Sequence, residues 1–401
     1  MIECKLITDK SLFDTFVENH IYTHYQKTST WGEYRVNYCG DEAYLMIGAF
    51  DERQLVGTAM VTITKRKGIG KVAYVAQGLC IDYQNKKLVH LLIDAIHRNV
   101  KPYKVTCLKM DFNVKRCLHA IDGSVIEGED NQWLTDFLVS MGFKHRGYGY
   151  AYDGSWANRF TLIAPVSKDK YEKTVQKSLM QAVNRQLKTG LIVRDGCDED
   201  LPAFVKAAQT LGDKKHFTAD NETYFSNYIN ANKPYSVFKI AEIDYELKAK
   251  IFEEELNSSK VRRNPELLAS VQRKYEQAIA DVNAGKTKEI LGGAIYMRIG
   301  NMLFDPYTYT FKEHNEFKAA ACLHIATSRQ YVPMGVDYLD FVGFAGNTDV
   351  NDPYYGLYDF KSKFGSEFVE YIGEFDYVYK KNQYNTDKTL RKLKSWIKHH
   401  A

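Results

Sequence analysis

Apolar and polar positions divide the chain into alternating segments of two kinds. Residues Ala43–Phe50 and Gln54–Thr64 are apolar runs of strand length, and the charged residues between them predict a hairpin turn. Val72–Gly78 and Val105–Phe112 predict two further strands. Between them, Lys86–Asn99 carries its apolar residues at helical spacing. Strands that alternate with helices predict a mixed α/β protein.

The second half of the chain repeats part of this order. The strand start Leu55–Ala59 is echoed by Ile290–Ala294. The helical segment Phe317–Arg329 leads into the apolar run Tyr338–Phe344, as the first-half helix leads into its own strand. The chain has 401 residues, which is ample for two domains. We therefore expect two related α/β domains packed side by side, although the echo is short enough to arise by chance.

Residues 242–286 interrupt this order. Apolar residues recur there at steps of three and four, and Asn264-Pro265 is typical of a helix start. The recurring positions are Tyr245, Ala249, Phe252, Leu256, Leu268, Val271, Tyr275, Ala278 and Val282. This spacing predicts a coiled-coil-like arm of two antiparallel helices, inserted into the second domain. The first domain is then 1–150, and the second is 151–241 with 287–401. Such an arm fits either a structural hairpin or a lever that touches a large partner.

Charge and cysteine content narrow the classes of function. The net charge is +4, so a nucleic acid would have to bind to local basic patches. Two segments supply such patches, although a charged helix face is more often simply solvated. They are Lys168, Lys170, Lys173, Lys177, Arg185 and Lys188 in the first, and Lys388, Arg391, Lys392, Lys394 and Lys398 in the second.

The seven cysteines contain no CxxC pair, which predicts reduced thiols and no metal site. The first residues lack the order of a signal peptide, and no run approaches the roughly 20 apolar residues that span a bilayer. We expect a cytoplasmic protein and, absent any sign of an assembly, a monomer.

Gly68–Lys71 contains two glycines and a lysine but lacks the spacing of a phosphate-binding loop. Residues 65–70 could also hold the pyrophosphate of coenzyme A, but such a loop joins a strand to a helix. Here both flanking segments predict strands, so a hairpin turn fits better. An acetyl-CoA-dependent N-acetyltransferase would need such a loop, and it is the alternative function.

Three longer stretches carry a pattern found in a known family. They are Tyr25–Arg35, with glutamine, tryptophan and a basic residue in order; Ser178–Gly196, a basic helix before a turn and strand; and Gly356–Gly365, continued by Glu370–Phe375. They resemble the Fem family of non-ribosomal peptidyltransferases, which build interpeptide branches in Gram-positive cell walls, and above all its FemX-like and MurM-like members. The resemblance implies two tandem acetyltransferase-like (GNAT-type) domains with no cofactor.

The resemblance also implies the substrates. The donor would be an aminoacyl-tRNA, and the acceptor an amine of a UDP-linked or lipid-linked muropeptide, usually lysine at the third position of the stem. A lipid-linked acceptor would bring the protein to the inner face of the membrane. A non-catalytic tRNA-binding protein is a further alternative, because the arm and the basic helices would serve it equally well.

Three substrate-binding residues follow from the resemblance. Arg35 matches a basic residue that helps to bind the acceptor diphosphate, and Lys214 stands where the family has a second, phosphate-binding arginine. The guanidinium group of arginine can bind a phosphate through two parallel hydrogen bonds, whereas the lysine ammonium is a point charge. We therefore expect a weaker contact between Lys214 and the phosphate. Phe304 stands where the family has a tyrosine, and it lacks the hydroxyl. Arg35 and Lys214 would also fit ordinary surface cations.

Two catalytic residues follow in the same way. Lys361 matches a family lysine proposed to stabilise the transition state, as a donor to the ester oxygen when it becomes an anion. Asp111 matches an aspartate near the acceptor amine, although Phe112 replaces the usual proline. An aspartate of ordinary pKa, about 3.9, is a poor base unless burial raises the value. We therefore expect Asp111 to orient the amine. The alternative is a structural role, in which Asp111 ends a strand and caps a turn.

Overall fold

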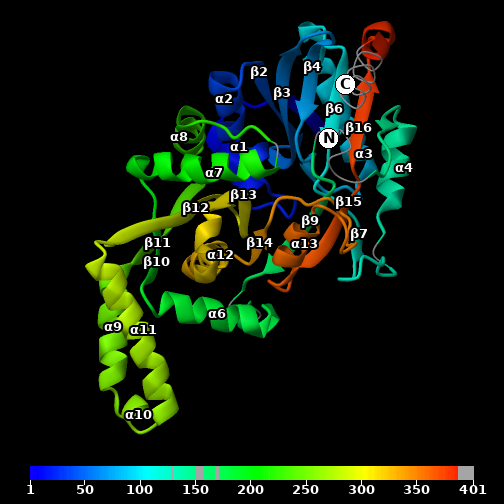
Figure 1. Ribbon diagram of the computed structural model, residues 1–401. Coiled ribbons are helices and arrows are strands. Elements are labelled where there is room, and N and C mark those ends of the chain that lie inside the picture. Colours follow the sequence, from blue (N-terminus) through cyan, green and yellow to red (C-terminus); the bar gives the residue numbers. More distant parts are fainter. Residues whose placement is uncertain (129, 150–156, 168–170, 216, 387–401) are drawn as a thin grey trace.

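The computed structural model describes residues 1–128, 130–149, 157–167, 171–215 and 217–386. Two mixed β-sheets lie side by side with helices packed around them, and a helical hairpin projects from the second sheet (Figure 1). The prediction of a mixed α/β fold with two sheets is confirmed. The basic segment 388–398, together with Lys168 and Lys170, lies outside the described residues.

The first sheet has the order β1-β2-β3-β4-β6-β16-β8, and β5 pairs with β3. Its strands are β1 Ile2–Leu6, β2 Asp41–Asp51, β3 Gln54–Arg66, β4 Gly70–Val75, β5 Cys80–Ile81, β6 Cys107–Asp111, β8 Lys144–His145 and β16 Glu374–Val378. All pairings are antiparallel except that of β4 with β6. The predicted hairpin between β2 and β3 is present, and residues 67–69 form a turn between β3 and β4.

Helices α1 (Lys10–Glu18), α2 (Ser29–Tyr38), α3 (Lys86–Val100) and α4 (Gln132–Ser140) accompany this sheet. The Asn85 side chain caps α3 by accepting a hydrogen bond from the Leu88 N–H. The apolar stripe predicted for this helix is buried in the core of the first sheet, with Leu92 and Ile96 fully inaccessible. Each such side chain contributes roughly 1.5–3 kcal/mol of transfer free energy, which fixes α3 on the sheet.

The second sheet has the order β10-β11-β12-β13-β14-β9-β15-β7. Its strands are β7 Lys115–His119, β9 Phe160–Pro165, β10 Leu191–Asp195, β11 Ser236–Asp244, β12 Lys288–Ile299, β13 Met302–Thr310, β14 Tyr338–Asp340 and β15 Glu367–Tyr371. Its helices are α5 Tyr171–Thr174, α6 Lys177–Leu187, α7 Leu201–Lys215, α8 Glu222–Ala231, α12 Ala319–Tyr331 and α13 Tyr355–Ser362.

The two sheets exchange strands. Strand β7 comes from the first third of the chain but pairs with β15 of the second sheet. Strand β16, near the end of the described chain, pairs with β6 and β8 of the first sheet. A cut at residue 150 therefore does not separate the two sheets, and the domain boundaries stay a prediction.

The echo seen in the sequence has a structural counterpart. Helix α3 precedes β6, which runs parallel to β4 and antiparallel to β16. Helix α12 precedes β14, which runs parallel to β13 and antiparallel to β9. Asp111 ends β6 and Asp340 ends β14. The two aspartates therefore occupy matching places in the two sheets.

The helical arm is inserted between β11 and β12, as predicted. It consists of α9 Tyr245–Asn257, a short α10 Ser259–Arg262 and α11 Pro265–Asn283. Ala249, Phe252, Val271 and Ala278 are buried between its helices. Leu268 is one exception to the predicted spacing, because it is 36% exposed and its neighbour Leu267 packs inward instead.

A cluster of aromatic rings joins the two sheets. Tyr25 and Tyr34 from the N-terminal segment pack with Tyr228 of α8 and Phe304 of β13 in one buried core. Rings from both halves meet here edge to face, a favourable geometry for aromatic pairs. Part of the high tyrosine content thus forms a core between the sheets.

Candidate active site

Asp111 lies at the wall of a small pocket where β6 and β16 meet. Its carboxylate accepts hydrogen bonds from the Tyr74 hydroxyl and from the Gln77 N–H, the latter at 3.1 Å. Burial raises the pKa of Asp111 to about 6, despite these two donors. Such a carboxyl group is a far better proton acceptor near neutral pH than an ordinary aspartate. The sequence supplied the residue but not this shift.

The Asp111 pocket has a volume of about 120 Å³. Arg146, Arg159, Tyr371 and Glu374 also line it. Arg146 pairs with Asp376 at 3.2 Å, and Arg159 pairs with Glu370. The pocket thus combines a carboxyl group of raised pKa with two guanidinium groups, a mixture suited to a polar or anionic ligand.

A second pocket lies on the other side of Tyr74. It has a volume of about 240 Å³ and is lined by Trp31, Arg35, Arg66 and Tyr74 among others. Because Tyr74 also donates to Asp111, one side chain borders this Arg35 pocket and contacts the wall of the Asp111 pocket.

The two predicted phosphate-binding cations lie on different helices, and only Arg35 lines the Arg35 pocket. Arg35 on α2 forms a bidentate pair with Asp41, at 2.8 and 3.0 Å, and faces the Arg35 pocket. Lys214, at the end of α7, is exposed. Lys214 and Lys215 lower the pKa of Lys312 nearby, so this surface is locally basic. Phosphate binding by either cation stays a prediction.

Lys361 is buried on α13 rather than exposed in a groove. Its Nζ donates to the carbonyl oxygens of Phe341 and Gly343, both at 2.6 Å. Burial lowers its pKa to about 8, although Asp305 and Asp340 favour the charged form. It is not among the residues that line the Asp111 pocket. Its role in the transition state stays a prediction.

Tyr371 connects the surroundings of Lys361 with the Asp111 pocket. It lines that pocket, and its hydroxyl helps to lower the pKa of Asp340, whose carboxylate also interacts with the Lys361 charge. Phe304, by contrast, belongs to the aromatic core between the sheets. Its ring meets His24 at 4.4 Å and is 2% exposed. Its predicted contact with substrate is untested.

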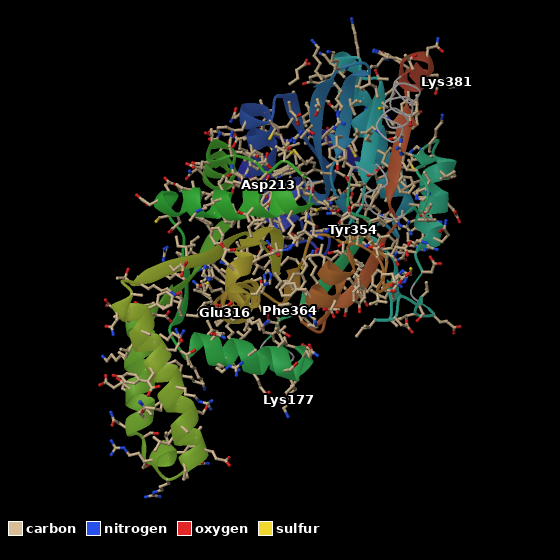
Figure 2. The ribbon with its side chains drawn as sticks, in the orientation of Figure 1. Lys177, Asp213, Glu316, Tyr354, Phe364 and Lys381 are labelled. Carbon is tan, nitrogen blue, oxygen red and sulfur yellow. The ribbon has the colours of Figure 1, made fainter. Side chains whose placement is uncertain are left out.

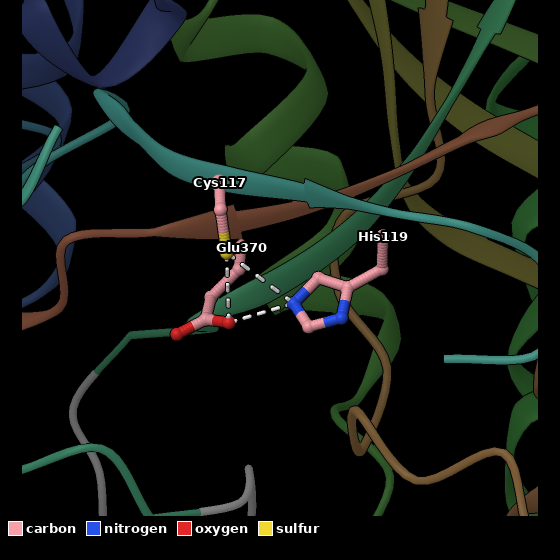
Figure 3. Close-up of side chains that lie close together, drawn as sticks. All are labelled: Cys117, His119 and Glu370. Carbon is pink, nitrogen blue, oxygen red and sulfur yellow. Dashed lines mark hydrogen bonds and ion pairs between the residues drawn. The ribbon is translucent and has the colours of Figure 1, made fainter. Parts of the chain in front are cut away.

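One group of metal-binding side-chain types lies close together within the described part of the chain. Cys117, His119 and Glu370 hold their ligand atoms within 4.8 Å of one another (Figure 3). His119 Nε2 is 2.7 Å from Glu370 Oε2, and Cys117 Sγ is 3.4 Å from the same oxygen. The other ring nitrogen of His119 faces the Gly123 carbonyl at 2.8 Å.

The charges around this group do not favour a cation. The second carboxylate oxygen of Glu370 pairs with both Arg116 and Arg159. Two guanidinium groups already offset the carboxylate and would repel a divalent ion. They hold the pKa of Glu370 below its usual value. The cluster is therefore best described as a buried polar network that ties β7 to β15.

A large groove runs between the arm and α6. Its volume is about 1410 Å³. Its lining includes four acidic residues and six basic ones, which are Arg185, Lys188, Lys248, Arg273, Lys274 and Lys286. Of the first predicted basic patch, Arg185 and Lys188 thus face this groove. Helix α6 extends from the arm toward α13 (Figures 1 and 2), and the Gln176 N–H at its start donates to the Lys363 carbonyl.

Comparison with known proteins shows the family to which this chain belongs. Residues 8–392 match the FemAB family. The chain belongs to the FemAB family. Among curated members, aminoacyltransferase FemA of Staphylococcus aureus is 24% identical over 416 residues, covering 96% of this chain and 97% of that protein. FemA of Staphylococcus epidermidis is 22% identical, covering 95% and 97%. These full-length FemAB relatives bear out the prediction of an aminoacyltransferase.

The crystal structure of FemX shares the fold of this FemAB protein. It superposes with a TM-score of 0.80 at 22% identity, covering 96% of this chain and 99% of FemX. The resemblance recognised in the three sequence stretches is confirmed by the family match over residues 8–392. Within the described residues, no helix is long and apolar enough to cross a membrane.

Several pocket residues escaped the sequence analysis. Tyr74, Arg146, Arg159 and Glu374 come from four distant segments, and none stands in a recognisable motif. Glu374 lay within a stretch already singled out for resemblance, Glu370–Phe375. That stretch was the only signal available for it. The pairing of β6 with β16 sets Glu374 opposite Asp111, that of β4 with β6 brings in Tyr74, and Arg146 follows β8, which pairs with β16.

Proposed function

We propose that this FemAB protein transfers an amino acid from aminoacyl-tRNA to a stem-peptide amine of a peptidoglycan precursor. The expected acceptor is lysine at the third position of a UDP-linked or lipid-linked muropeptide. The observation that carries the proposal is the Asp111 pocket, where a carboxyl group with a pKa of about 6 meets two guanidinium groups. No cofactor takes part, and the protein acts as a monomer in the cytoplasm or at the inner face of the membrane.

In this proposal Asp111 binds the acceptor amine. A lysine amine has a pKa near 10.4, so it arrives as an ammonium ion. The ionised Asp111 carboxylate orients that ion and accepts one proton from it, which frees the nitrogen lone pair to attack the ester carbonyl. The Tyr74 hydroxyl fixes the position of the carboxylate. The raised pKa supports proton transfer in addition to the orienting role expected from the sequence.

Lys361 serves the other side of the reaction. As the amine adds to the ester, the carbonyl oxygen becomes an anion that needs a nearby positive charge. With a pKa of about 8, Lys361 is mostly charged at neutral pH. Two of its protons are held by carbonyl oxygens, which leaves the third for the oxyanion. The tetrahedral intermediate then collapses and breaks the ester C–O bond. The leaving tRNA oxygen takes the second proton that the nitrogen loses, and the amide bond is complete.

The groove between the arm and α6 is proposed to bind the tRNA. Its excess of lysine and arginine suits a phosphate backbone. Helix α6 links the groove with α13, on which Lys361 lies. A tRNA whose acceptor end followed α6 would approach the buried lysine from the second sheet, and the muropeptide would approach from the first.

The test is transfer from a panel of charged tRNAs to a lysine pentapeptide precursor, resolved by mass. Growth of the precursor by the mass of one amino acid residue supports the proposal and identifies the donor. The Asp111→Asn variant is the matched control, since it keeps the shape and removes the ionisable group. Consumption of acetyl-CoA in place of charged tRNA, or binding of tRNA without transfer to any muropeptide, would contradict the proposal.

A further inference from the structure

Lys27 is a buried cation that the proposed reaction does not use. It ends the short 3-10 helix Tyr25–Lys27 and is 2% exposed. Its ammonium donates to the carbonyl oxygen of Tyr22 at 2.8 Å, to that of Leu79 at 3.3 Å, and to Oδ1 of Asn113 at 2.9 Å. These three acceptors are neutral, which is unusual for a buried lysine, because buried charges are normally paired.

Two of the three acceptors lie on segments that set the position of Asp111. Gln77 and Gly78 have φ of +59° and +74°, and Leu79 ends the left-handed turn that they form. The N–H of Gln77, in that turn, donates to Asp111 Oδ2. Asn113 follows Asp111 by two residues and also donates weakly to the Tyr22 and Thr23 carbonyls.

One ammonium group thus ties the N-terminal segment to both flanks of the carboxylate. A shift in either flank would move the Gln77 N–H away from Asp111 or rotate the end of β6. The neutral partners also leave the Lys27 charge uncompensated at this place. It therefore favours the ionised form of Asp111, as the smallest of the resolved influences on that carboxyl group.

We propose that Lys27 is a positioning residue for Asp111: it holds the Gln77–Leu79 turn and Asn113 in place, and its charge favours the ionised carboxylate. The inference rests on the proposed function, in which Asp111 binds and deprotonates the acceptor amine. Lys27 does not touch the pocket. It acts only through Asp111.

The charged and titratable groups around Asp111 come from several elements: Arg146, Arg159 and Tyr371 line the same pocket, and the Tyr83 hydroxyl is close enough for the Asp111 charge to raise its pKa. Tyr74 on β4 donates to the carboxylate, Glu374 on β16 raises its pKa, and Lys27 on the 3-10 helix lowers it. Burial contributes more than any of them. Lys27 is thus the basic residue that offsets the carboxylate of Glu374, and without it the proton would be held more tightly.

The Lys27→Met variant keeps the length of the side chain and removes the charge. The readout is the pH dependence of kcat/KM for transfer to the muropeptide, which reports the free enzyme's ionisations. We expect the acid limb to move upward by up to about one pH unit, because Lys27 is the smallest of the resolved influences on the pKa of Asp111. The rate at pH 8 should fall much less than the rate at pH 6.

Lys239→Met is the matched control. Lys239 is also 2% exposed, but it lies on β11 of the second sheet, where it pairs with Asp195 and Gln330. It should lower the thermal midpoint without moving the acid limb. An equal shift of the limb in both variants would show that Lys27 acts only through general stability and would overturn the inference.

Asn113→Asp provides a second route should Lys27→Met not fold. It is nearly isosteric and places a carboxylate against the Lys27 ammonium, which neutralises the charge without deleting the side chain. The acid limb should again move upward. A limb unchanged in Asn113→Asp, or in a folded Lys27→Met protein, overturns the inference.

The inference and the proposed function fail in different ways. Wild-type protein that transfers nothing to any muropeptide contradicts the proposed function. An acid limb that persists in Asp111→Asn shows that another group titrates, which removes Asp111 as the base. Active wild-type protein whose limb disappears in Asp111→Asn, but does not move in the Lys27 and Asn113 variants, contradicts the positioning role alone.

Discussion

Asp111 and Asp340 end matching strands of the two sheets but meet different surroundings. Both carboxylates are buried, and each interacts with a buried lysine. Each also accepts a hydrogen bond from the N–H of a residue with positive φ, which is Gln77 for Asp111 and Val342 for Asp340. For Asp111 that lysine is Lys27, and for Asp340 it is Lys361. Burial raises the pKa of both carboxyl groups.

The difference lies in access. Asp111 lines a pocket, whereas Asp340 is enclosed by the Thr161 hydroxyl, the Val342 N–H and Tyr371. In the second sheet the residue that the family resemblance implies to be catalytic is Lys361, and not the enclosed carboxylate of Asp340. In the proposed reaction, the same local arrangement supplies the base in the first sheet and the cation in the second. A raised pKa indicates a reactive group only where a substrate can reach it.

The largest effect is expected from removing the base. Asp111→Asn should lower the transfer rate about 10²- to 10⁴-fold, the usual range for general acid–base catalysis. Single-turnover transfer to a muropeptide measures it. Asp340→Asn is the comparison, since it alters the enclosed carboxylate and should mainly lower thermal stability. Equal loss of rate in both folded variants would erase the distinction between the two sites.

Removing the cation should have the next largest effect. Lys361→Ala loses one donor to the oxyanion, which costs roughly 2.7–4 kcal/mol in comparable sites, or about 10²- to 10³-fold in rate. Binding of the muropeptide, measured by calorimetry, should be largely kept. Because Lys361 also holds two carbonyl oxygens, circular dichroism must first show that the variant is folded. Full single-turnover activity would rule out the proposed role.

The pH dependence should show both groups at once. Activity requires ionised Asp111, with a pKa of about 6, and charged Lys361, with a pKa of about 8. We expect a bell-shaped profile of kcat/KM that falls about tenfold per pH unit beyond either limb. Initial rates between pH 5 and pH 9 measure it.

Stability should not follow the acid limb. Since the folded-state pKa of Asp111 lies above the unfolded value near 3.9, the folded chain binds more protons between these values. The contribution of Asp111 to stability therefore rises as the pH falls through this window, while activity declines. A thermal midpoint that dropped in step with activity only in the wild type, and not in Asp111→Asn, would contradict this assignment.

The smallest effect is expected at Tyr74. Tyr74→Phe removes one hydrogen bond to the Asp111 carboxylate, and that bond lowers the pKa of Asp111. The acid limb should move upward by about half a pH unit and the rate should fall a few-fold, in line with a net contribution of about 1 kcal/mol. The pH–rate profile measures it, and a limb that moved downward would show that the hydroxyl does not stabilise the ionised form.

Much of the fold follows from local pattern. The hairpin of β2 and β3, helix α3 and the arm were all predicted, because their periodicity is set by which face is buried. The stretch Ser178–Gly196 also has the expected order, since α6 ends at Leu187 and β10 begins at Leu191. The exchange of β7 and β16 was not predicted, because a five-residue strand carries no mark of its distant partner.

The candidate site was predictable only where a motif named its residues. Asp111, Lys361 and Arg35 came from the resemblance, but their burial and pairing depend on segments far away in the chain. The pKa of Asp111 depends on Tyr74, Glu374 and the depth of the pocket, none of which is visible from neighbours in sequence. Lys27 lies within Tyr25–Arg35, yet two of its three hydrogen-bond partners lie 52 and 86 residues away.

The crossing of β7 and β16 between the sheets has a consequence for assembly of the chain. During synthesis, the first half emerges with β6 still lacking its neighbour β16, which arrives only after residue 373 has been made. Until then an unpaired edge is open to unwanted contacts. A fragment that stopped near residue 150 should therefore be prone to aggregation, and adding the rest of the chain as a separate polypeptide should rescue its solubility.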